Sequence, residues 1–507
     1  MVQSTAMTIV LEQLPNDPEA LKKLILRLQG KINFLEEQFR LARHKQFAAS
    51  TEAASGQGEL FNEAEDAVDC TSKDEPESTE EIRYTRQKPK RKPLPKDLPR
   101  EEILHDLSDA EKICSCCQGD LHKIGEERSE QLEYIPAQLK VLEHIRPKYA
   151  CRYCEKHNTQ TPIVIAPVPA SPIPKSIATP SLLSQVIVHK YQFALPLYRQ
   201  EALFKQHGIE LSRKTLSTWM IRCADLLSPI IHRLKQHLKE QPVIHADETP
   251  LKVIQDEKTK SYMWLYCSGR DSPTEEGIKN IVLYDYQVSR SGHCAVSYLE
   301  GYSGYLQVDG YVGYEQTAST LVGCMAHARR KFKEAQDAQK NKQAGKAQWA
   351  LNHIQKLYRI EGQLAGKSKE EKYEIRQSQA KPLVVEFKHW LEDSAKQVAP
   401  KTLIGIAVHY CLNQWDKLKR YLENGELSID NNRAERAIKP FVIGRKNWLF
   451  SNTASGARAS AILYSLIETA KANAIDPLKY LQHLLTELPK ASSDTDLDVL
   501  MPWVLKI

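Results

Sequence analysis

Val243-Ile244-His245-Ala246-Asp247 is the most informative segment for the fold class, because it is a short β-type run that ends in a carboxylate. Thr249-Pro250 follows and predicts that this strand stops there. Similar runs at residues 262–267, 281–286 and 305–309 predict further strands of one sheet. The last run also ends in an aspartate, Asp309, so the sequence predicts carboxylates at the tips of two neighbouring strands.

These two carboxylates could converge on one divalent cation. Hard oxygen ligands suit Mg²⁺ or Mn²⁺, and a third acid is expected to complete the site. Glu435 is the candidate, because residues 428–435 open a helix whose first turn would face the sheet. Two strand-end aspartates followed by a helical glutamate favour a ribonuclease-H-like plan, in which three carboxylates hold two metal ions for in-line displacement at a phosphodiester.

Each acid also has an ordinary structural explanation. Asp247 and Asp309 precede turns, where aspartate is common, and Asn432 and Glu435 have the spacing of a capping box. Alternating side-chain direction would turn the neighbour of Asp247 to the opposite face of the strand. The pattern still leaves three rival ligands open: Glu248, Asp285 and Asp430.

The composition is that of an ordinary globular protein. The chain has 507 residues, 41% hydrophobic and 26% charged, which is enough for three or four folding units and excludes a wholly disordered or fibrous chain. No apolar run approaches the roughly 18 residues of a membrane span, and residues 1–16 lack the features of a secretory signal. We therefore expect a cytoplasmic protein without a membrane partner. The net charge of +6 is by itself weak support for a polyanionic partner.

Residues 1–50 predict a leucine-rich helix. Spacings of four and three place one apolar seam along three heptads, formed by Leu21, Ile25, Leu28, Ile32, Leu35, Phe39 and Ala42. The seam favours a coiled coil with a second copy of the chain, and a helix packed on its own core is the close alternative.

Residues 51–100 predict a linker whose charge changes sign. Residues 52–81 carry eleven acidic residues against one lysine, which is typical of a disordered segment. Residues 83–100 carry eight Lys or Arg residues, including Arg91 and Lys92, between prolines that keep the chain extended. Extended cations suit a phosphate backbone, although such a run is often only solvated.

Residues 101–165 contain two Cys-x-x-Cys pairs, Cys114 with Cys117 and Cys151 with Cys154. Four thiolates at this spacing predict a structural Zn²⁺ site, since tetrahedral zinc takes four ligands and leaves no open position. Leu139, Val141 and Ile145 alternate and predict a strand between the pairs, as in a zinc ribbon. A redox pair is the alternative, and three spare donors blur the ligand choice: Cys116, His122 and His157.

Residues 175–235 predict a helical, helix-turn-helix-like region. Helices are expected at 182–190 and 198–206, followed by a turn at His207-Gly208. Ser212 can cap a third helix that begins Arg213-Lys214, which would enter a major groove of DNA. An ordinary helical hairpin has the same pattern.

The rest of the chain predicts a core interrupted by helices. Residues 240–332 are the first part of the core, and 125 residues separate Asp309 from Glu435. Residues 333–425 are rich in helix-forming residues and predict a helical insertion. Residues 426–455 would return to the core with Glu435, and residues 456–507 would form a C-terminal helical domain. The expected fold is therefore a multidomain α/β protein.

Basic side chains surround the predicted acids. They suit DNA phosphates, although they could equally neutralise the carboxylates or face solvent. Trp448 could stack on a base, but its apolar neighbours favour the core. Together with the linker and the helical region, the residues expected to contact DNA are Arg91, Lys92, Arg213, Lys214, Arg329, Arg330, Arg433, Arg436, Lys439, Arg445 and Lys446.

These motifs resemble the insertion sequence 66 family of bacterial DDE transposases over nearly the whole chain. His245-Ala-Asp-Glu-Thr-Pro250, Gln307-Val-Asp-Gly-Tyr311 and Asp430-Asn-Asn-Arg-Ala-Glu-Arg436 are similar to the three catalytic blocks of that family. The resemblance extends to the basic Arg91-Lys-Pro-Leu-Pro95 segment, the cysteine ribbon and residues 324–332, 444–448 and 465–471. Ala48 stands where the family typically has glycine, and Ser455-Gly456 where it has a Gly-Gly turn.

The resemblance implies that Asp247, Asp309 and Glu435 are the catalytic triad and bind Mg²⁺. It also implies excision of a DNA element at its terminal inverted repeats and joining of the freed 3′ ends to target DNA. A homo-oligomer and two small accessory proteins of the same element are the implied partners. Two other functions remain open: a catalytically silent DNA-binding regulator, and a ribonuclease-H-like nuclease without strand transfer.

Overall fold

The computed structural model of this chain describes residues 17–47, 139–149, 164–256, 258, 260–270, 279–339, 345–491 and 493–505. The chain forms two compact units, Met1–Asp74 with Pro169–Ile507, and Glu75–Val168. Helices and strands are mixed, as the sequence predicts.

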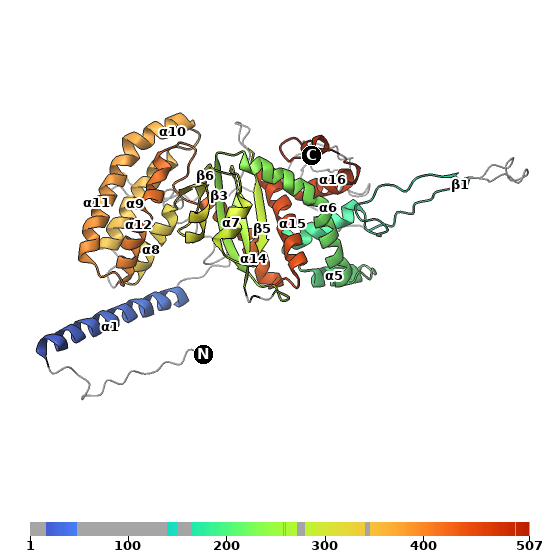
Figure 1. The fold of residues 1–507 in the computed structure, drawn as a ribbon. Coiled ribbons are helices and arrows are strands. Elements are labelled where there is room, and N and C mark those ends of the chain that lie inside the picture. Colours follow the sequence, from blue (N-terminus) through green and yellow to red (C-terminus); the bar gives the residue numbers. More distant parts are fainter. Residues whose placement is uncertain are drawn as a thin grey trace, which may run out of the picture. The chain divides into compact units, whose positions relative to one another are not determined.

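A five-stranded sheet is the framework of the larger unit (Figure 1). Its strands are β3 (Val243–Leu251), β4 (Ser261–Cys267), β5 (Val282–Gln287), β6 (Tyr305–Gln307) and β7 (Thr320–Val322). The spatial order is β5-β4-β3-β6-β7. Strand β4 is antiparallel to both β3 and β5, whereas β6 runs parallel to β3 and β7 parallel to β6.

Strand β3 runs through Thr249-Pro250 to Leu251, so the prediction that this pair ends the strand is wrong. Within the described residues, β3 pairs with β6 only at Val243, Ile244 and His245, and the later part of β3 pairs with β4 alone. A strand edge without a neighbour needs no N–H donor, and this explains how Pro250 is accommodated.

Helices cover both faces of the sheet. On one face lie α14 (Asn432–Trp448) and α15 (Ala454–Ala472), and Arg445 of α14 donates from Nη1 to the Thr249 hydroxyl at 3.1 Å. On the other face, α7 (Gly292–Tyr298) places the Tyr298 ring on Tyr266 of β4, with centroids 4.0 Å apart. Residues of β3 therefore alternate between the α14 face and the α7 face.

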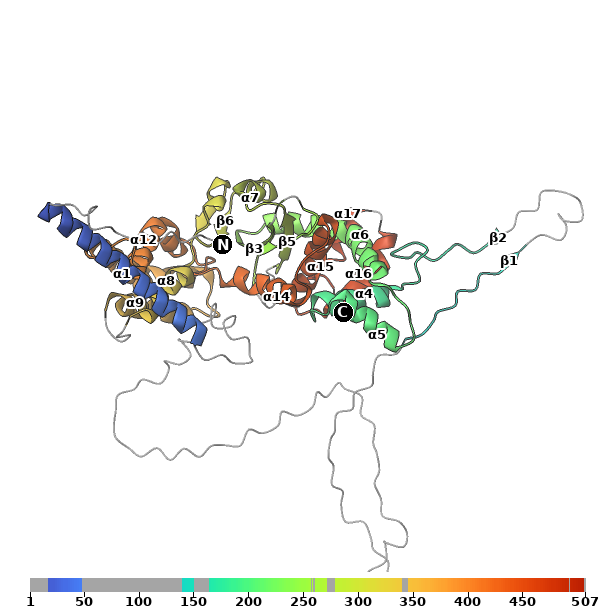
Figure 2. The same cartoon turned by 90° about the horizontal axis from the view of Figure 1, so that it is seen from below.

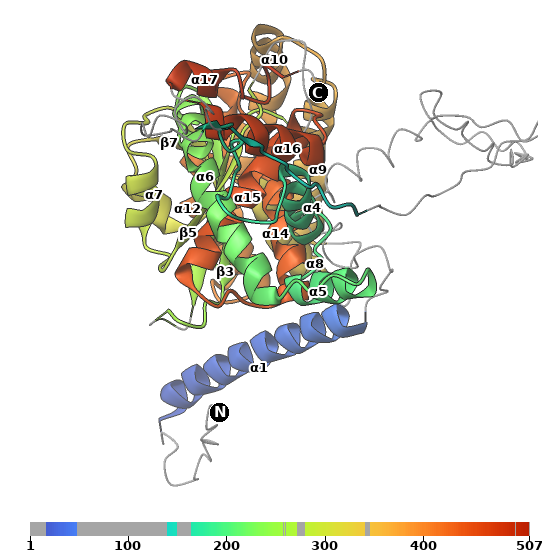
Figure 3. The same cartoon turned by 90° about the vertical axis from the view of Figure 1, so that its right-hand side faces the viewer.

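The outer edge of β5, which has no neighbouring strand among the described residues, forms hydrogen bonds with side chains of α15. The N–H groups of Val282 and Tyr284 donate to the hydroxyls of Thr469 (3.0 Å) and Ser465 (2.8 Å). A helix that supplies hydroxyl acceptors satisfies the edge without adding a strand. Figure 3 shows α15 beside β5, with α6 (Arg213–Lys239) next to it.

The predicted helices between residues 175 and 235 are confirmed as α4 (Pro180–Tyr191), α5 (Leu197–Gln206) and α6. Ser212 caps α6 by accepting from the Thr215 N–H at 3.2 Å. Leu216, Trp219 and Leu227 of α6 belong to the same apolar core as the sheet, α15 and α16 (Pro477–Glu487). The region is thus packed into the sheet domain, while the start of α6 remains exposed.

Residues between β7 and α14 form the predicted helical insertion (Figure 2). It contains α8 (Met325–Asp337), α9 (Lys346–Gly362), α10 (Lys369–Ile375), a π-helix, η4 (Arg376–Ala380), α11 (Lys381–Gln397), α12 (Leu403–Asn413), α13 (Trp415–Leu418) and η5 (Lys419–Leu422). Phe332, Phe387 and Leu391 lie in a second apolar core. The insertion therefore contributes its own stability.

The predicted N-terminal helix is α1 (Pro18–Phe47). Leu41 is buried with Ala335 of α8 and with Ala338 at the C-cap of that helix, and the Leu403 N–H donates to Glu37 at 3.2 Å. Much of the seam is exposed in the single chain, with Ile25, Ile32 and Phe39 at 56%, 50% and 64%.

In the smaller unit, β1 (Lys148–Tyr149) and β2 (Val164–Ile165) pair antiparallel. The strand predicted over Leu139, Val141 and Ile145 is wrong, because residues 139–147 have no regular structure. Val141 is 93% exposed. An alternating pattern stabilises a strand only where one face is buried.

Candidate active site

Asp247 in β3 and Asp309 just beyond β6 occupy equivalent positions relative to two parallel strands. His245 of β3 pairs with Gln307 of β6, and each aspartate lies two residues beyond that last pair. Side chains two residues apart in a strand lie on one face, so the two carboxylates leave the sheet where β3 and β6 separate. Crevices at the carboxyl ends of parallel strands are the usual ligand sites of such sheets.

One hydrogen bond and one close contact constrain the conformation of the loop after Asp309. Asp309 accepts a hydrogen bond from the Tyr311 N–H at 2.8 Å, which orients one carboxylate oxygen. A Cβ on Gly310 would lie 2.9 Å from the ring of Tyr410 in α12. Glycine is therefore required where the insertion packs against this loop.

Glu435 lies in the first turn of α14, and Asn431 at the N-cap ties that helix to β3. The Asn431 side-chain N–H donates to the carbonyl of Ala246 at 2.8 Å, and its Oδ1 lies 3.1 Å from Nδ1 of His245. This contact fixes the start of the Glu435 helix beside Asp247. Sequence reasoning missed Asn431, although it lies inside the Asp430-Asn-Asn motif.

The three acids interact through their charges. Burial raises the pKa of the Asp247 carboxyl well above its ordinary range, and the charges of Glu248, Asp309 and Glu435 raise it further. Burial raises the pKa of Glu435 to about 8, although the Arg330 guanidinium opposes the shift. Clustered carboxylates whose charged forms are disfavoured are a signature of functional sites.

These residues fit a hard divalent cation. Both carboxylate oxygens of Glu435 are buried without a hydrogen-bond partner, and the side chain is 2% exposed. A cation bound between the acids would supply the missing coordination and offset their mutual repulsion. Asp247, Asp309 and Glu435 are the residues that would hold it.

Three residues of α8 and its N-cap line the other side of Glu435. Nδ1 of His327 lies 3.4 Å from one carboxylate oxygen, and the Arg330 guanidinium lies 3.6 Å from the other. Burial lowers the pKa of His327 to about 4, so this imidazole is neutral near pH 7 and the contact is not a salt bridge. Cys324 is the N-cap residue. The Cys-x-x-His spacing at a helix start is the signal that identifies this group.

The rival acids have other partners. Glu248 faces the other side of β3, where its carboxylate accepts from the Tyr314 hydroxyl at 2.6 Å and from Nε of Arg290 at 2.8 Å. Asp285 of β5 accepts from the Gln287 amide at 2.7 Å. Asp430 accepts from the Tyr358 hydroxyl at 2.8 Å, which links the α14 loop to the insertion.

Most of the predicted DNA-contacting residues in the described chain are at least partly exposed. Arg213 and Lys214 at the start of α6, and Lys446 in α14, are exposed. Five others are half-buried: Arg329, Arg330, Arg436, Lys439 and Arg445. Arg433 requires a correction, because it is 7% exposed and its Nη2 donates to the Ser268 carbonyl at 3.3 Å. A buried guanidinium of this kind supports the fold rather than contacting DNA.

Some predictions fall outside the described residues, namely Arg91, Lys92 and the zinc-binding cysteines Cys114, Cys117, Cys151 and Cys154. Trp448 is half-buried and packs edge-on against Phe441, as the preference for the core predicts. Among the described helices, not one combines the length and apolar character needed to cross a membrane.

Comparison with known families gives matches along the chain. The model described as "Transposase IS66 family" matches residues 175–459. The "zinc-finger binding domain of transposase IS66" matches residues 111–155, and the "IS66 C-terminal element" residues 465–503. A further model, "Transposase C of IS166 homeodomain", matches residues 34–103.

Curated relatives are similar over nearly their whole length. "Uncharacterized protein y4jD" of Sinorhizobium fredii (strain NBRC 101917 / NGR234) is 32% identical over 97% of each chain. "Uncharacterized protein y4hP" of the same organism is 32% identical over 95% of this chain and 89% of its own. No solved structure gives a significant match.

Proposed function

Because the chain belongs to the IS66 family of transposases, we propose that it cuts DNA at the terminal inverted repeats of an insertion sequence and joins the freed ends to target DNA. The observation that carries this proposal is the charge interaction of the buried Asp247 carboxyl with Asp309 and Glu435, beside the point where β3 and β6 separate. Retention of three interacting acids disfavours a silent regulator, which would not need them.

We assign the sheet to the ribonuclease-H-like fold. Three antiparallel strands are followed by two parallel ones, with one acid in the first strand, one just beyond the fourth and one on a later helix, and this arrangement supports the assignment. The helical insertion separates the fourth and fifth strands from the helix of the third acid.

In this reaction Asp247, Asp309 and Glu435 would hold Mg²⁺ or Mn²⁺, and the metal would stabilise the charge that develops on the attacking and leaving oxygens of an in-line displacement. Asn431 keeps the α14 helix, and with it Glu435, against β3. No side-chain nucleophile is required, because water cuts the strand and the 3′-hydroxyl then attacks the target.

We propose that exposed and half-exposed cations bind the DNA backbone without reading sequence. Each phosphate contact that is removed should lower the salt dependence of DNA binding by about one unit of slope. Lys446→Ala is therefore expected to weaken binding to all sequences alike. Arg213, Lys214, Arg329, Arg330, Arg436, Lys439 and Arg445 belong to the same proposed set. Arg91 and Lys92, which lie outside the described residues, are also proposed to bind DNA phosphates.

We also propose that Cys114, Cys117, Cys151 and Cys154 bind one structural Zn²⁺, supported by the zinc-finger match over residues 111–155. The exposed seam of α1 supports pairing with a second copy of the chain. Two small accessory proteins of the same element complete the proposed partners, and the DNA would be that of the bacterial nucleoid.

The test is mobilisation of a marked donor that carries the element's own ends, with the neighbouring small genes supplied. Intact protein should give joined products, whereas Asp247→Asn, Asp309→Asn and Glu435→Gln should give none while still binding the ends. Asp285→Asn is the matched control, since its carboxylate lies on another strand and is paired with Gln287.

The outcome separates the proposed function from its two alternatives. Cut ends without joined products would indicate a nuclease. Equal binding by the intact and variant proteins, with no cutting or joining in either, would indicate a regulator.

A further inference from the structure

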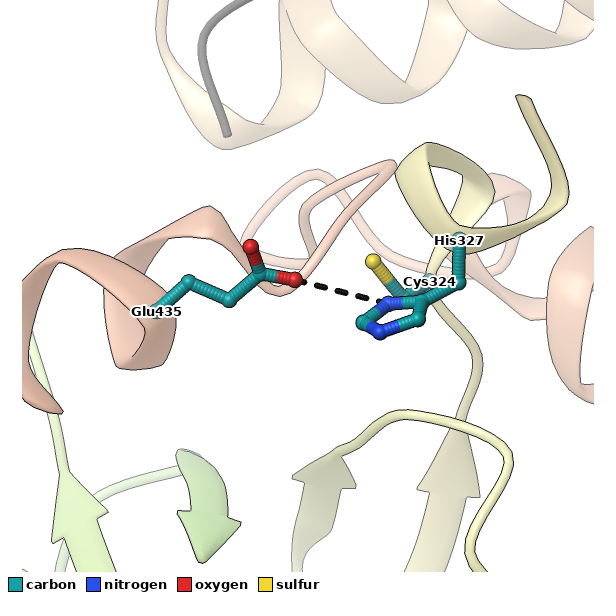
Figure 4. A group of neighbouring side chains, drawn as sticks. All are labelled: Cys324, His327 and Glu435. Atoms are coloured by element: carbon teal, nitrogen blue, oxygen red, sulfur yellow. Dashed lines mark ion pairs between the residues drawn. The ribbon is translucent and has the colours of Figure 1, made fainter. Parts of the chain in front are cut away.

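Three side chains of different chemistry point toward one another beside α8. Figure 4 shows the Cys324 thiol, the His327 imidazole and the Glu435 carboxylate facing a common space. One sulfur, one nitrogen and one oxygen atom of these residues lie within 4.8 Å of one another. The acids Asp247 and Asp309 offer only oxygen, so this cluster differs in kind from the proposed magnesium site.

The separation of His327 and Glu435 matches that of two ligands on one small tetrahedral ion. Zn²⁺ binds nitrogen and oxygen at about 2.0–2.2 Å, so two such ligands at tetrahedral angles lie about 3.4 Å apart. His327 Nδ1 and Glu435 Oε1 are 3.4 Å apart. Both atoms are buried and neither has a hydrogen-bond partner.

The protein holds the three ligands in place before any ion binds. Cys324 and His327 are three residues apart at the start of α8, which puts them on one face of the helix. The Asn431 N–H donates to the Cys324 sulfur at 3.2 Å, and the Met325 N–H donates to the Ile429 carbonyl at 3.0 Å. These bonds join the start of α8 to the loop that begins the Glu435 helix.

We infer that Cys324, His327 and Glu435 form a binding site for one thiophilic divalent cation of the zinc class. Thiolate and imidazole ligands select Zn²⁺, Co²⁺ or Cd²⁺ over Mg²⁺. Three protein ligands leave one position of a tetrahedral ion open to water. The alternative is that the three side chains only fill space between α8 and α14.

An ion bound at this site would affect DNA cleavage, a consequence that rests on the proposed function. Glu435 is shared between the two sites, so an ion held by Cys324 and His327 competes with the proposed magnesium site for this carboxylate. Zinc therefore inhibits cleavage that Mg²⁺ supports. The thiophilic ion is therefore an inhibitor that acts at the same active site.

The first experiment measures binding alone. Full-length protein is dialysed to equilibrium against buffered free zinc that keeps the proposed cysteine ribbon filled, and bound zinc is counted per chain. We expect Cys324→Ala and His327→Ala each to bind one equivalent less than the intact protein, with affinity at the lost site at least about 100-fold weaker. With Co²⁺ as the probe, the thiolate-to-metal absorption of the intact protein should decrease in Cys324→Ala.

Cys411→Ala is the matched control, because Cys411 is also buried but lies in α12 and belongs to no such cluster among the described residues. It should bind as much zinc as the intact protein. His327→Ala keeps the test valid if Cys324→Ala misfolds. The His327 side chain is partly exposed, so its removal should disturb the fold less. Equal zinc content in all four proteins, or an equal loss in Cys411→Ala, overturns the inference.

The second experiment adds zinc to the magnesium-supported cleavage of the element's ends. Zinc at the concentration that fills the site should inhibit the intact protein and Cys411→Ala at least about tenfold, with less inhibition of Cys324→Ala relative to its own zinc-free rate. If the intact protein cuts no DNA, the proposed function fails while the zinc count still decides the site. If zinc fills the site and does not inhibit DNA cleavage, the inferred inhibition by zinc is overturned, while the binding site itself stands.

Discussion

Asn431 and Ala246 are 185 positions apart in the chain, yet the Asn431 amide donates to the Ala246 carbonyl at 2.8 Å. Asn431 is 1% exposed, and Ala246 directly precedes Asp247. One side chain thus connects the helix that carries Glu435 to the strand that carries Asp247. The relative position of these two acids depends on it.

Asn431→Ala should therefore damage catalysis more than folding. Loss of the donor leaves a buried carbonyl unsatisfied, which costs about 1–3 kcal/mol of unfolding free energy. A shift of the acids by about 1 Å can reduce cleavage by about 100-fold. Urea unfolding and end cleavage measure the two effects separately.

Asn447→Ala is the control for this variant. Asn447 also lies in α14 and donates to a carbonyl, that of Ala194, but the bond is exposed. Normal cleavage by Asn447→Ala and by Asn431→Ala alike would show that the β3 contact does not position Glu435.

The raised pKa of Glu435 predicts how stability changes with pH in magnesium-free buffer. Its pKa is 4.5 in the unfolded reference and about 8 in the folded protein. The folded state therefore binds the extra proton, and stability is lost as the pH rises from 4.5 to 8. Glu435→Gln removes the titration, so the variant should melt at a higher temperature than the intact protein at pH 8. The difference should vanish toward pH 4.5.

Asp393→Asn is the comparison, because the pKa of Asp393 is shifted in the opposite direction to that of Glu435. A hydrogen bond from Lys396 lowers the pKa of this exposed carboxyl, so the substitution should not stabilise the protein at pH 8. A Glu435→Gln variant that is no more stable than the intact protein at pH 8 would contradict the burial of a charged carboxylate in the absence of metal.

Glu248→Gln tests whether the face of β3 opposite Asp247 takes part in cleavage. Arg290 would lose its carboxylate partner, but its side chain is 44% exposed and can be hydrated, so we expect a loss of about 1 kcal/mol. Glu248 faces α7 rather than α14, and cleavage should fall by less than about tenfold. Loss of cleavage as complete as in Asp247→Asn would instead make Glu248 a metal ligand.

Local sequence signals predicted the parts of the fold that local physics determines. Ser212, the turn at Gly208 and the apolar period of α6 place a helix start within one residue, because capping and amphipathic spacing act over a few positions. The insertion was predictable from its helix-forming composition for the same reason.

Long-range contacts explain what the sequence did not predict. The basic character of Arg433 suggested DNA contact, but its guanidinium reaches the Ser268 carbonyl 165 positions away. Both aspartates were predicted as strand-end acids, but Asp247 lies inside β3, and only Asp309 lies just beyond the end of its strand. The β3–β6 register gives the two residues equivalent positions along the sheet. Neither the register nor the role of Asn431 is encoded by neighbouring residues.

Arg376 is the residue of the insertion whose loss should cost most. It is 3% exposed and forms bidentate bonds with Glu361, at 2.9 Å from Nε and 2.6 Å from Nη2. Its other donors reach the carbonyls of Tyr421, Asn424 and Leu427 at 2.9–3.0 Å. The side chain thus fixes the segment that leads to the Asp430 loop.

Arg376→Met should lower the unfolding free energy by about 3–5 kcal/mol, because it leaves the Glu361 carboxylate and three carbonyls without their donor. Arg376→Lys should recover little, since a lysine cannot form the planar fork. Lys396→Met is the control: its pair with Asp393 is exposed, and no measurable change is expected. Urea unfolding of the three variants tests this order. Equal stability of Arg376→Met and Lys396→Met would mean that water replaces the arginine, and that the insertion does not depend on it to hold the α14 loop.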